Sequence, residues 1–200
     1  LKTGGTELFS PLLDKGIEKV NKEYILTFPE ELRKPYLSFL KKAFDTVEFK
    51  VTEARKNGKD SFSVPVSFKP VNIAKTTEDI RNTYLSSMSS TDLSQETQSL
   101  LEAASKTLED APAYESKANI TIDVKKTEDG FSLDEKSLEI LLSQVLRDYM
   151  EPYSSVCEIL DVHNFLTAYL DASFKGDVAQ FALYTDRTVE ETAAWYEQDT

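Results

Sequence analysis

The only histidine, His163, and the only cysteine, Cys157, are the side chains of this sequence best suited to proton transfer and nucleophilic chemistry. His163 is predicted in the first turn of a helix, beside Asp161, where general acid–base work would be its natural role. No Ser or Cys motif accompanies it, and a helix N-terminus disfavours the imidazolium form. The acidic neighbours Glu158 and Asp161 oppose formation of a thiolate at Cys157, so we do not expect a reactive nucleophile there. We expect Cys157 to be a small hydrophobic side chain that is buried or half-buried. The sequence therefore predicts no catalytic residue.

Three acidic residues, Asp123, Glu128 and Asp129, surround a predicted turn and form the one cluster that could attract a cation. Their spacing is not that of a calcium-binding loop, so we expect no metal there. The alternative is that calcium binds to these carboxylates adventitiously. The sequence has no second histidine or cysteine for zinc, no phosphate-binding glycine loop and no nucleophile elbow. Residues 119–121 match a glycosylation sequon, but their place inside a predicted strand makes this a chance match. We predict no metal, no cofactor and no enzymatic activity.

The richest aromatic group lies near the C-terminus and consists of Phe181, Tyr184, Trp195 and Tyr196. Such rings can form a ligand-stacking or partner-binding surface, because they offer large apolar faces with polar tips. The alternative is the ordinary core of amphipathic helices. We name these four residues as the candidate ligand or partner surface.

Composition limits the choice of partner. Lys and Arg total 23 against 35 Asp and Glu, which gives a net charge of −12 and disfavours nucleic acid and anionic membrane surfaces. Residues 151–200 hold ten acidic and two basic residues, net −8. No apolar run is long enough to span a membrane. A single cysteine fits a reducing compartment and equally a bacterial exported protein without disulfides.

Two β-hairpins are predicted from alternation of apolar and polar residues. In residues 47–69, apolar positions alternate on both sides of an Asn57-Gly58 turn, and Pro65 indicates an edge strand or a bulge. In residues 117–133, a long alternating strand turns at Asp129-Gly130 and returns through a short strand. We expect one antiparallel sheet with the apolar sets on a single covered face: Val47, Phe49 and Val51; Phe62, Val64, Val66 and Phe68; Ile120, Ile122 and Val124.

Helical spacing fills the remainder. Helices are predicted from Ser10, after Pro29, after Thr76 or Thr77, over residues 93–108, after a Ser132–Glu135 capping box to Pro152, and over residues 162–174, where Lys175-Gly176-Asp177 forms the C-cap and turn. A short helix over residues 178–183 follows, and a last helix begins at a cap that is either Asp186 or Thr188, which forms a capping box with Glu191. Pro35 is expected to mark the true first turn of the second helix, and residues 153–161 to be a linker. The predicted fold class is α+β, an antiparallel sheet with helices across one face.

Residues 169–198, with Lys-Gly-Asp after a helix and then an acidic helix, resemble the opening of small exported modules. Residues 29–70 and the second hairpin resemble the continuation of the same modules. The family consists of lipoproteins of Gram-positive bacteria, assigned to domains of unknown function with a cystatin-like or NTF2-like fold. The resemblance implies export and a lipid anchor on a cysteine outside this chain. It implies no activity and no site residues, and Cys157 lacks the apolar run of a lipobox.

The order of these segments leaves the domain organisation open. We predict one module over residues 1–200, with residues 153–200 alternatively the opening of a repeat or a permuted or swapped N-terminal part. In the single-module case, the helix over residues 162–174 packs across the sheet. The predicted function is a non-catalytic, exported, cell-surface-tethered binding module for an unknown protein, peptide or small apolar ligand. The alternative is a pocket protein of the NTF2-like type for a small apolar ligand or a peptide.

Overall fold

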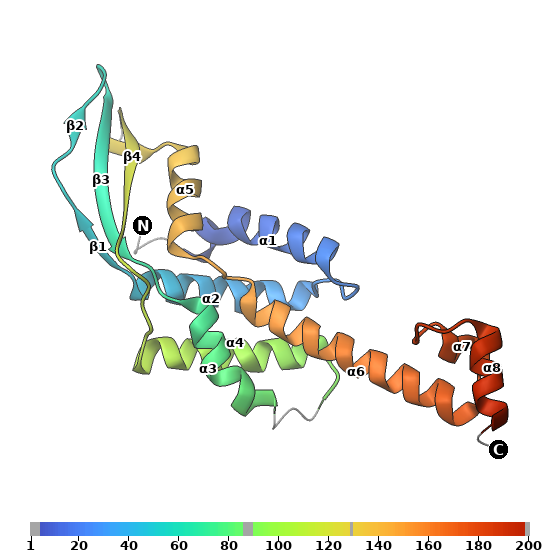
Figure 1. Cartoon of the computed structure of the whole chain (residues 1–200). Coiled ribbons are helices and arrows are strands. Elements are labelled where there is room, and N and C mark those ends of the chain that lie inside the picture. The colour runs from blue at the N-terminus through green and yellow to red at the C-terminus, as the bar shows by residue number, and fades with distance from the viewer. Residues whose placement is uncertain (1–4, 86–89, 129, 199–200) are drawn as a thin grey trace. The chain divides into compact units, whose positions relative to one another are not determined.

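A computed structural model describes residues 5–85, 90–128 and 130–198 (Figure 1). The chain divides into two compact units, an N-terminal unit Leu1–Val156 and a C-terminal unit Cys157–Thr200. In chain order the elements are η1 (Thr6–Phe9), α1 (Ser10–Glu23), η2 (Glu30–Leu32), α2 (Arg33–Thr46), β1 (Glu48–Val51), β2 (Arg55–Lys56), β3 (Ser61–Lys69), α3 (Ile73–Leu85), α4 (Leu93–Asp110), β4 (Ala118–Thr127), β5 (Gly130–Leu133), α5 (Glu135–Val145), α6 (Glu151–Lys175), α7 (Val178–Ala182) and α8 (Val189–Gln198).

The predicted α+β class is confirmed, because both hairpins belong to one antiparallel sheet with strand order β1-β3-β4-β5. The ladder pairs Phe49 with Phe68, Val66 with Ile120 and Val64 with Ile122. Residues paired in this way share a face of the sheet, so the three predicted apolar sets lie on the same face. Val47, Val66, Phe68 and Ile122 are buried, whereas Val51 is 62% exposed at the end of β1. The other members of the three sets are half-buried.

Helices cover that apolar face, and Figure 1 shows α1, α2 and α5 on one side of the strands. A chain of ring contacts joins the two layers: Phe9 to Phe44 at 5.6 Å, Phe44 to Phe49 at 5.2 Å, and Phe49 to Phe68 at 6.0 Å between centroids. Edge-on and tilted ring pairs at these distances add to the stabilisation from burial. These rings form the part of the core in which α2 meets β1 and β3, and buried residues of α1, α4 and α5 extend it.

Of the two alternatives predicted for Pro65, the edge strand is wrong, because β3 is central in the sheet. A bulge does lie beside it, in the facing strand, since residues 52–54 oppose only residues 64–65 between the pairs Val51–Val66 and Arg55–Ser63. The Pro65 carbonyl oxygen accepts a hydrogen bond from the Thr52 N–H at 3.1 Å. In an antiparallel ladder the N–H and C=O of one residue point to the same neighbour. On that side β1 ends at Val51 and β2 begins at Arg55, so the missing N–H of Pro65 faces an interruption in the neighbouring strand.

The turns of both hairpins lie close to where the sequence predicts them. The Asn57 N–H donates to the Ser61 carbonyl at 3.0 Å, which closes the first turn. Arg55 and Lys56, predicted as part of a polar turn, instead form β2 and pair with β3. In the second turn, Asp129 lies outside the described residues, and Gly130 begins β5 with a φ of +130° that favours glycine.

Two predicted helix caps are wrong. Thr76 and Thr77 do not cap α3 but lie within it, and their hydroxyls donate back to the carbonyls of Asn72 and Ile73, both at 2.9 Å. The N-terminus of α3 is capped by the Asn72 side chain, which accepts from the Lys75 N–H at 2.8 Å. Asparagine and threonine are both good N-caps, because the side-chain oxygen of either accepts a hydrogen bond from a free backbone N–H of the first turn. The sequence has both types close together, at Asn72 and at Thr76 and Thr77, so the cap could not be chosen from residue type alone.

The Ser132–Glu135 capping box is likewise not formed. Asp134 is the N-cap of α5, and its carboxylate accepts from the Ser137 N–H at 3.2 Å. The prediction that β5 is short and leads directly into a helix is confirmed, since β5 ends at Leu133 and α5 begins at Glu135.

Pro152 begins a helix rather than ending one. The preceding helix α5 already ends at Val145, and Pro152 lies in the first turn of α6, where proline loses no helical hydrogen bond. The predicted linker over residues 153–161 is therefore helical. Tyr153 is completely buried, its N–H donates to the Tyr36 hydroxyl at 3.2 Å, and its ring lies 5.0 Å from that of Phe28.

The C-terminal unit contains the later part of α6, then α7 and α8. Gly176, with a φ of +64°, ends α6 as predicted. The Thr188–Glu191 capping box is confirmed, with the Glu191 N–H donating to Thr188 Oγ1 at 3.2 Å and the Thr188 N–H donating to Glu191 Oε2 at 2.8 Å. Packing of residues 162–174 across the sheet stays a prediction, as does the single-module organisation.

Candidate functional site

The two residues suited to proton transfer and nucleophilic chemistry lie in different environments. His163 is exposed, and it lies twelve positions after the start of α6 at Glu151 rather than in a first helical turn. The prediction that His163 lies in the first turn of a helix is therefore wrong. Cys157 is a free, completely buried cysteine, as predicted for a small apolar side chain.

Of the three acidic residues near the second turn, Asp123 forms hydrogen bonds within the sheet. Asp123 accepts from the Ser63 hydroxyl at 2.8 Å and from the Asn57 side-chain amide at 3.4 Å. These bonds connect the two hairpins. In the described ranges, no three His, Cys, Asp or Glu side chains are grouped closely enough to hold a metal ion, and Asp129 lies outside those ranges.

The four predicted aromatic residues are joined by ring contacts within the C-terminal unit. Phe181 stacks on Trp195 at 5.9 Å with an interplanar angle of 5°, and lies 5.6 Å from Tyr196. The ring of Tyr184 is connected to them through the rings of Phe165 and Tyr169, and its backbone N–H donates to the Phe181 carbonyl at 3.1 Å. The Tyr196 hydroxyl donates to the Ser173 carbonyl at 3.0 Å, which ties α8 to α6.

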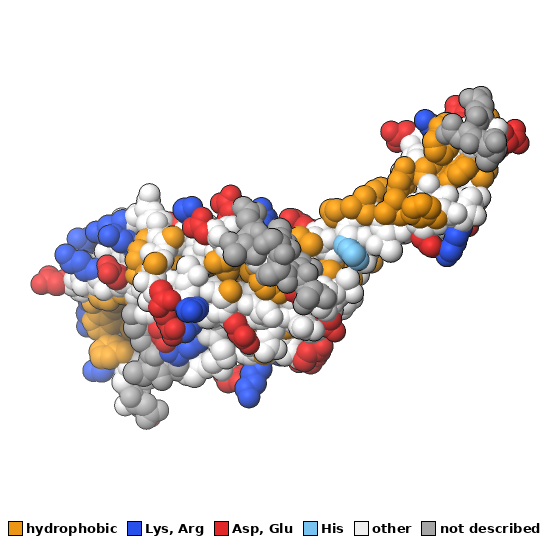
Figure 2. Space-filling model, turned by 90° about the horizontal axis from the view of Figure 1, so that it is seen from below, with side chains coloured by type: hydrophobic (Ala, Val, Ile, Leu, Met, Phe, Trp, Pro, Cys, Tyr) orange, Lys and Arg blue, Asp and Glu red, His pale blue; other side chains and the backbone are white. Residues whose placement is uncertain are grey.

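These rings differ in their access to solvent. Phe181 is 3% exposed and contacts the rings of Tyr169, Trp195 and Tyr196, whereas Trp195 is 38% exposed. The guanidinium of Arg187 lies 5.4 Å from the centre of the Trp195 ring, a cation–π distance. Further apolar side chains on α6 are exposed in the same unit, and Figure 2 shows them as an orange surface: Val162, Phe165, Leu166, Leu170 and Phe174.

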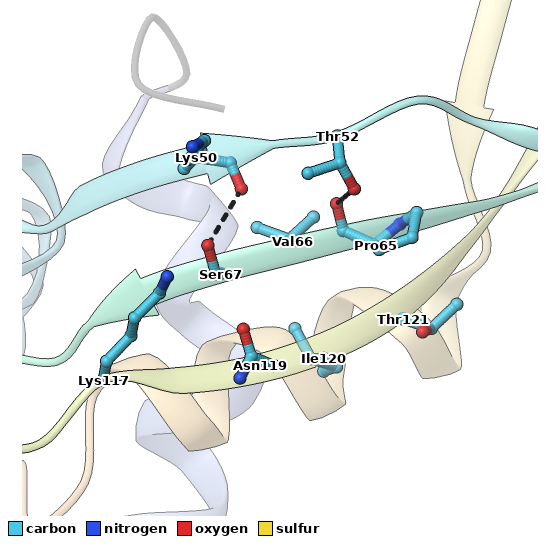
Figure 3. Close-up of a pocket in the computed structure, with 9 residues that line it drawn as sticks. All are labelled: Lys50, Thr52, Pro65, Val66, Ser67, Lys117, Asn119, Ile120 and Thr121. Carbon is cyan, nitrogen blue, oxygen red and sulfur yellow. Dashed lines mark hydrogen bonds between the residues drawn. The ribbon is translucent and has the colours of Figure 1, made fainter.

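A second candidate site, which the sequence analysis missed, lies on the sheet. We call it the sheet groove, a hollow of about 330 Å³ that β1, β3 and the beginning of β4 line (Figure 3). Its lining residues are Lys50, Thr52, Pro65, Val66, Ser67, Lys117, Asn119, Ile120 and Thr121. In Figure 3, helices in the colours of α1 and α5 lie behind the strands, so the groove opens on the opposite face of the sheet, away from those helices.

Ladder register brings these side chains together. Lys50 pairs with Ser67, and Ser67 pairs with Asn119, so three residues far apart in the sequence lie side by side on the polar face. The groove adjoins the interruption beside Pro65, since Thr52 and Pro65 both line it. The Thr52 hydroxyl donates to the Pro65 carbonyl at 3.3 Å. The sequence signal for the site was the polar half of the same alternation that predicted the strands.

The charge of this region is opposite to that of the chain. Residues 48–69 contain five basic and three acidic residues, and residues 117–127 contain three basic and one acidic. Eight positive against four negative charges give these two segments +4, in a chain of −12. Figure 2 shows blue side chains gathered at the strands. The lining of the groove itself includes two lysines and no carboxylate.

The two tyrosines with clearly shifted acidity belong to the fold rather than to a site. Burial raises the pKa of Tyr149 to about 12, and its hydroxyl donates to the Leu12 carbonyl at 2.6 Å. Burial, together with a hydrogen bond to Glu96, raises the pKa of Tyr84 to about 12. Neither residue lines the sheet groove.

Comparison with known proteins gives little beyond these observations. No family model matches the chain, and no curated protein matches it. Among solved structures, the crystal structure of a "putative lipoprotein (ycdA)" from Bacillus subtilis subsp. subtilis str. 168 is similar, with 15% sequence identity and a TM-score of 0.48. The match covers 68% of this chain and 42% of that chain. In the part of the chain that the structure describes, no helix is long and apolar enough to cross a membrane. The likeness to the Bacillus protein is too distant to assign a fold family or a function.

Proposed function

We propose that this chain is a non-catalytic binding module whose ligand lies on the polar face of the sheet. The observation that carries the proposal is the sheet groove, a hollow on the polar face of the sheet, opposite the face on which α1 and α5 lie. A few convergent polar groups around a hollow of this size are typical of ligand sites. The groups that would contact the ligand are the side chains of Lys50, Thr52, Ser67, Lys117, Asn119 and Thr121.

The location and fold type of the module belong to the same proposal. A cystatin-like or NTF2-like type is supported by helices packed on one face of an antiparallel sheet. Export and attachment through a lipid anchor outside this chain rest on the sequence resemblance of residues 29–70 and 169–198. Antibody labelling of intact and of permeabilised cells tests the location, because a surface protein is labelled in both.

A pair of tryptophan substitutions tests binding at the groove. Thr121→Trp fills the groove from an exposed strand position, and Thr127→Trp places the same ring on the same face of β4 outside the lining. Thermal unfolding of the wild type is measured against a library of sugars, peptides and small anions. We expect ligands that raise the Tm of the wild type and of Thr127→Trp but not of Thr121→Trp. A library without such a ligand, or equal shifts in both variants, contradicts the proposal.

The second candidate function is binding of a small apolar ligand or a peptide by the C-terminal unit. The exposed part of Trp195, beside Arg187 and the apolar side chains of α6, favours it. Titration with anilinonaphthalene sulfonate, whose fluorescence rises on apolar surfaces, tests it. We expect weaker dye binding by Trp195→Ala than by Phe131→Ala, which removes an exposed ring from the N-terminal unit. Equal binding by the two variants would exclude the aromatic surface as the site.

A further inference from the structure

We infer that the sheet groove takes a phosphate-bearing polyol, with Lys50 and Lys117 as the phosphate contacts and the neutral polar side chains as contacts for hydroxyl groups. The inference rests on the proposed function, because it names the ligand class of the same site. A sugar phosphate and one unit of a polyol-phosphate polymer share this chemistry.

The local charge of the strands decides the sign of the ligand. The lining of the groove holds two lysines and no carboxylate, although the whole chain carries −12. At physiological ionic strength, charges farther away than about 8 Å are largely screened. A small anion in the groove therefore responds to the nearby lysines and little to the acidic helices of the chain.

The lysines of the groove are also uncommitted. Outside the strands, basic side chains form ion pairs, as in Lys15–Glu139, Arg33–Asp14 and Lys175–Asp171. Lys50 and Lys117 have no acidic partner within 4.0 Å in the described ranges of the chain. An anion bound between them would not have to displace an existing carboxylate, and no carboxylate lines the groove to repel it.

The neutral lining suits hydroxyl groups. Asn119 and Thr121 are exposed, and their side chains bond to no other described residue. The Asn119 amide offers both a donor and an acceptor, the combination that recognises neighbouring hydroxyls. Ser67 makes only a long bond of 3.5 Å, to the Lys50 carbonyl, so its hydroxyl can also turn to a ligand.

The class of anion follows from what the lining contains and from what is absent. Two lysines line the groove, and no carboxylate does. A phosphate monoester carries a charge of about −1.5 to −2 at pH 7 and three acceptor oxygens, so both ammonium groups can contact it, whereas a carboxylate carries a single charge. No aromatic ring lines the groove either, so a nucleotide base would have no stacking platform. The volume of about 330 Å³ lies at the small end for ligand pockets and fits one sugar-phosphate unit.

Calorimetric titration of the full chain tests the inference. The probes are glucose 6-phosphate, glycerol 3-phosphate and a poly(glycerol phosphate), with glucose, glycerol and glucuronate as comparisons. We expect phosphate-bearing probes to bind and their uncharged counterparts to bind at least about ten-fold more weakly, the effect of one charge-assisted contact. Binding of the polymer without binding of the monomers identifies a polymer as the source, and binding of the monomers identifies a free sugar phosphate.

Matched charge variants complete the test. Lys50→Gln with Lys117→Gln should weaken phosphate binding by about ten-fold or more. Lys125→Gln removes a charge from the same face of β4 outside the groove lining, and should leave binding within about two-fold because the exposed charge is screened. If Lys125→Gln weakened phosphate binding as much as the double variant does, the loss would be an effect of overall charge, and the inference would be overturned. Binding of glucose or glucuronate that Thr121→Trp abolishes, without any phosphate preference, would also overturn it and leave the proposed function standing.

Discussion

The two units of the chain use aromatic side chains in different ways. In the N-terminal unit, Phe9, Phe44 and Phe68 are at most 2% exposed, because helices cover them on one side and the sheet on the other. In the C-terminal unit, Phe165 is 48% and Trp195 is 38% exposed, although both take part in ring contacts. Short units bury a smaller share of their apolar surface. The difference indicates that aromatic clustering alone does not distinguish a core from a surface; the number of layers around the rings does.

The largest expected effect is loss of a ring from the two-layered core. Phe68→Ala should lower the free energy of unfolding by about 3–5 kcal/mol, since it removes a buried ring that contacts Phe49. Phe165→Ala, at a half-exposed position, should cost about 1 kcal/mol or less. Urea denaturation measures both. Equal costs would mean that the rings of the C-terminal unit are as well covered as those of the core.

A second contrast concerns glycine. A Cβ on Gly16 would lie 2.7 Å from the Tyr149 hydroxyl and 2.8 Å from Met150, so Gly16→Ala should destabilise the protein by about 1–3 kcal/mol. Gly176 has open space around it, and Gly176→Ala should cost about 1 kcal/mol through its φ of +64° alone. Gly5→Ala, with nothing within 4 Å, is the control. The prediction fails if Gly16→Ala unfolds at the same denaturant concentration as the control.

Alkaline pH should destabilise the N-terminal unit in part through the half-buried Tyr149. The pKa of Tyr149 is about 12 in the fold against 10.0 for an exposed tyrosine, so the unfolded chain loses this proton first. The stabilisation is complete below pH 10 and is lost as the pH rises from 10 to 12. In Tyr149→Phe, the free energy of unfolding should fall less over this interval. An identical pH profile for the two proteins would contradict the burial of this hydroxyl.

The smallest expected effect is at the only histidine. His163→Ala should change the free energy of unfolding by about 1 kcal/mol or less, because the side chain is exposed. Binding at the sheet groove should be unchanged, since His163 does not line it. The same denaturation series measures the stability, and calorimetry measures the binding. A loss as large as that of Phe68→Ala would show that α6 has more of the core around it than the structure describes.

The sequence predicted helices and strands correctly where a local pattern is compatible with only one structure. The alternation in residues 47–69 and 117–133 predicted the sheet and its apolar face, because a period of two leaves only one face to bury. Thr188 and Glu191 predicted a helix start for a similar reason, since their reciprocal bonds need no distant partner. The local rules were ambiguous at Pro152, because proline suits both the end of one helix and the first turn of the next.

Only the tertiary structure resolved such ambiguities. Pro152 begins α6 because Tyr153 is buried between Phe28 and Tyr36, residues more than a hundred positions earlier in the chain. The sheet groove also depends on distant segments, as Lys50, Ser67 and Asn119 become neighbours through two ladders. By itself the sequence determined which residues of each strand are polar and which are apolar. Which polar residues share a hollow was decided by strand register across the sheet, because hydrogen bonds between strands, and not spacing along one strand, set those distances.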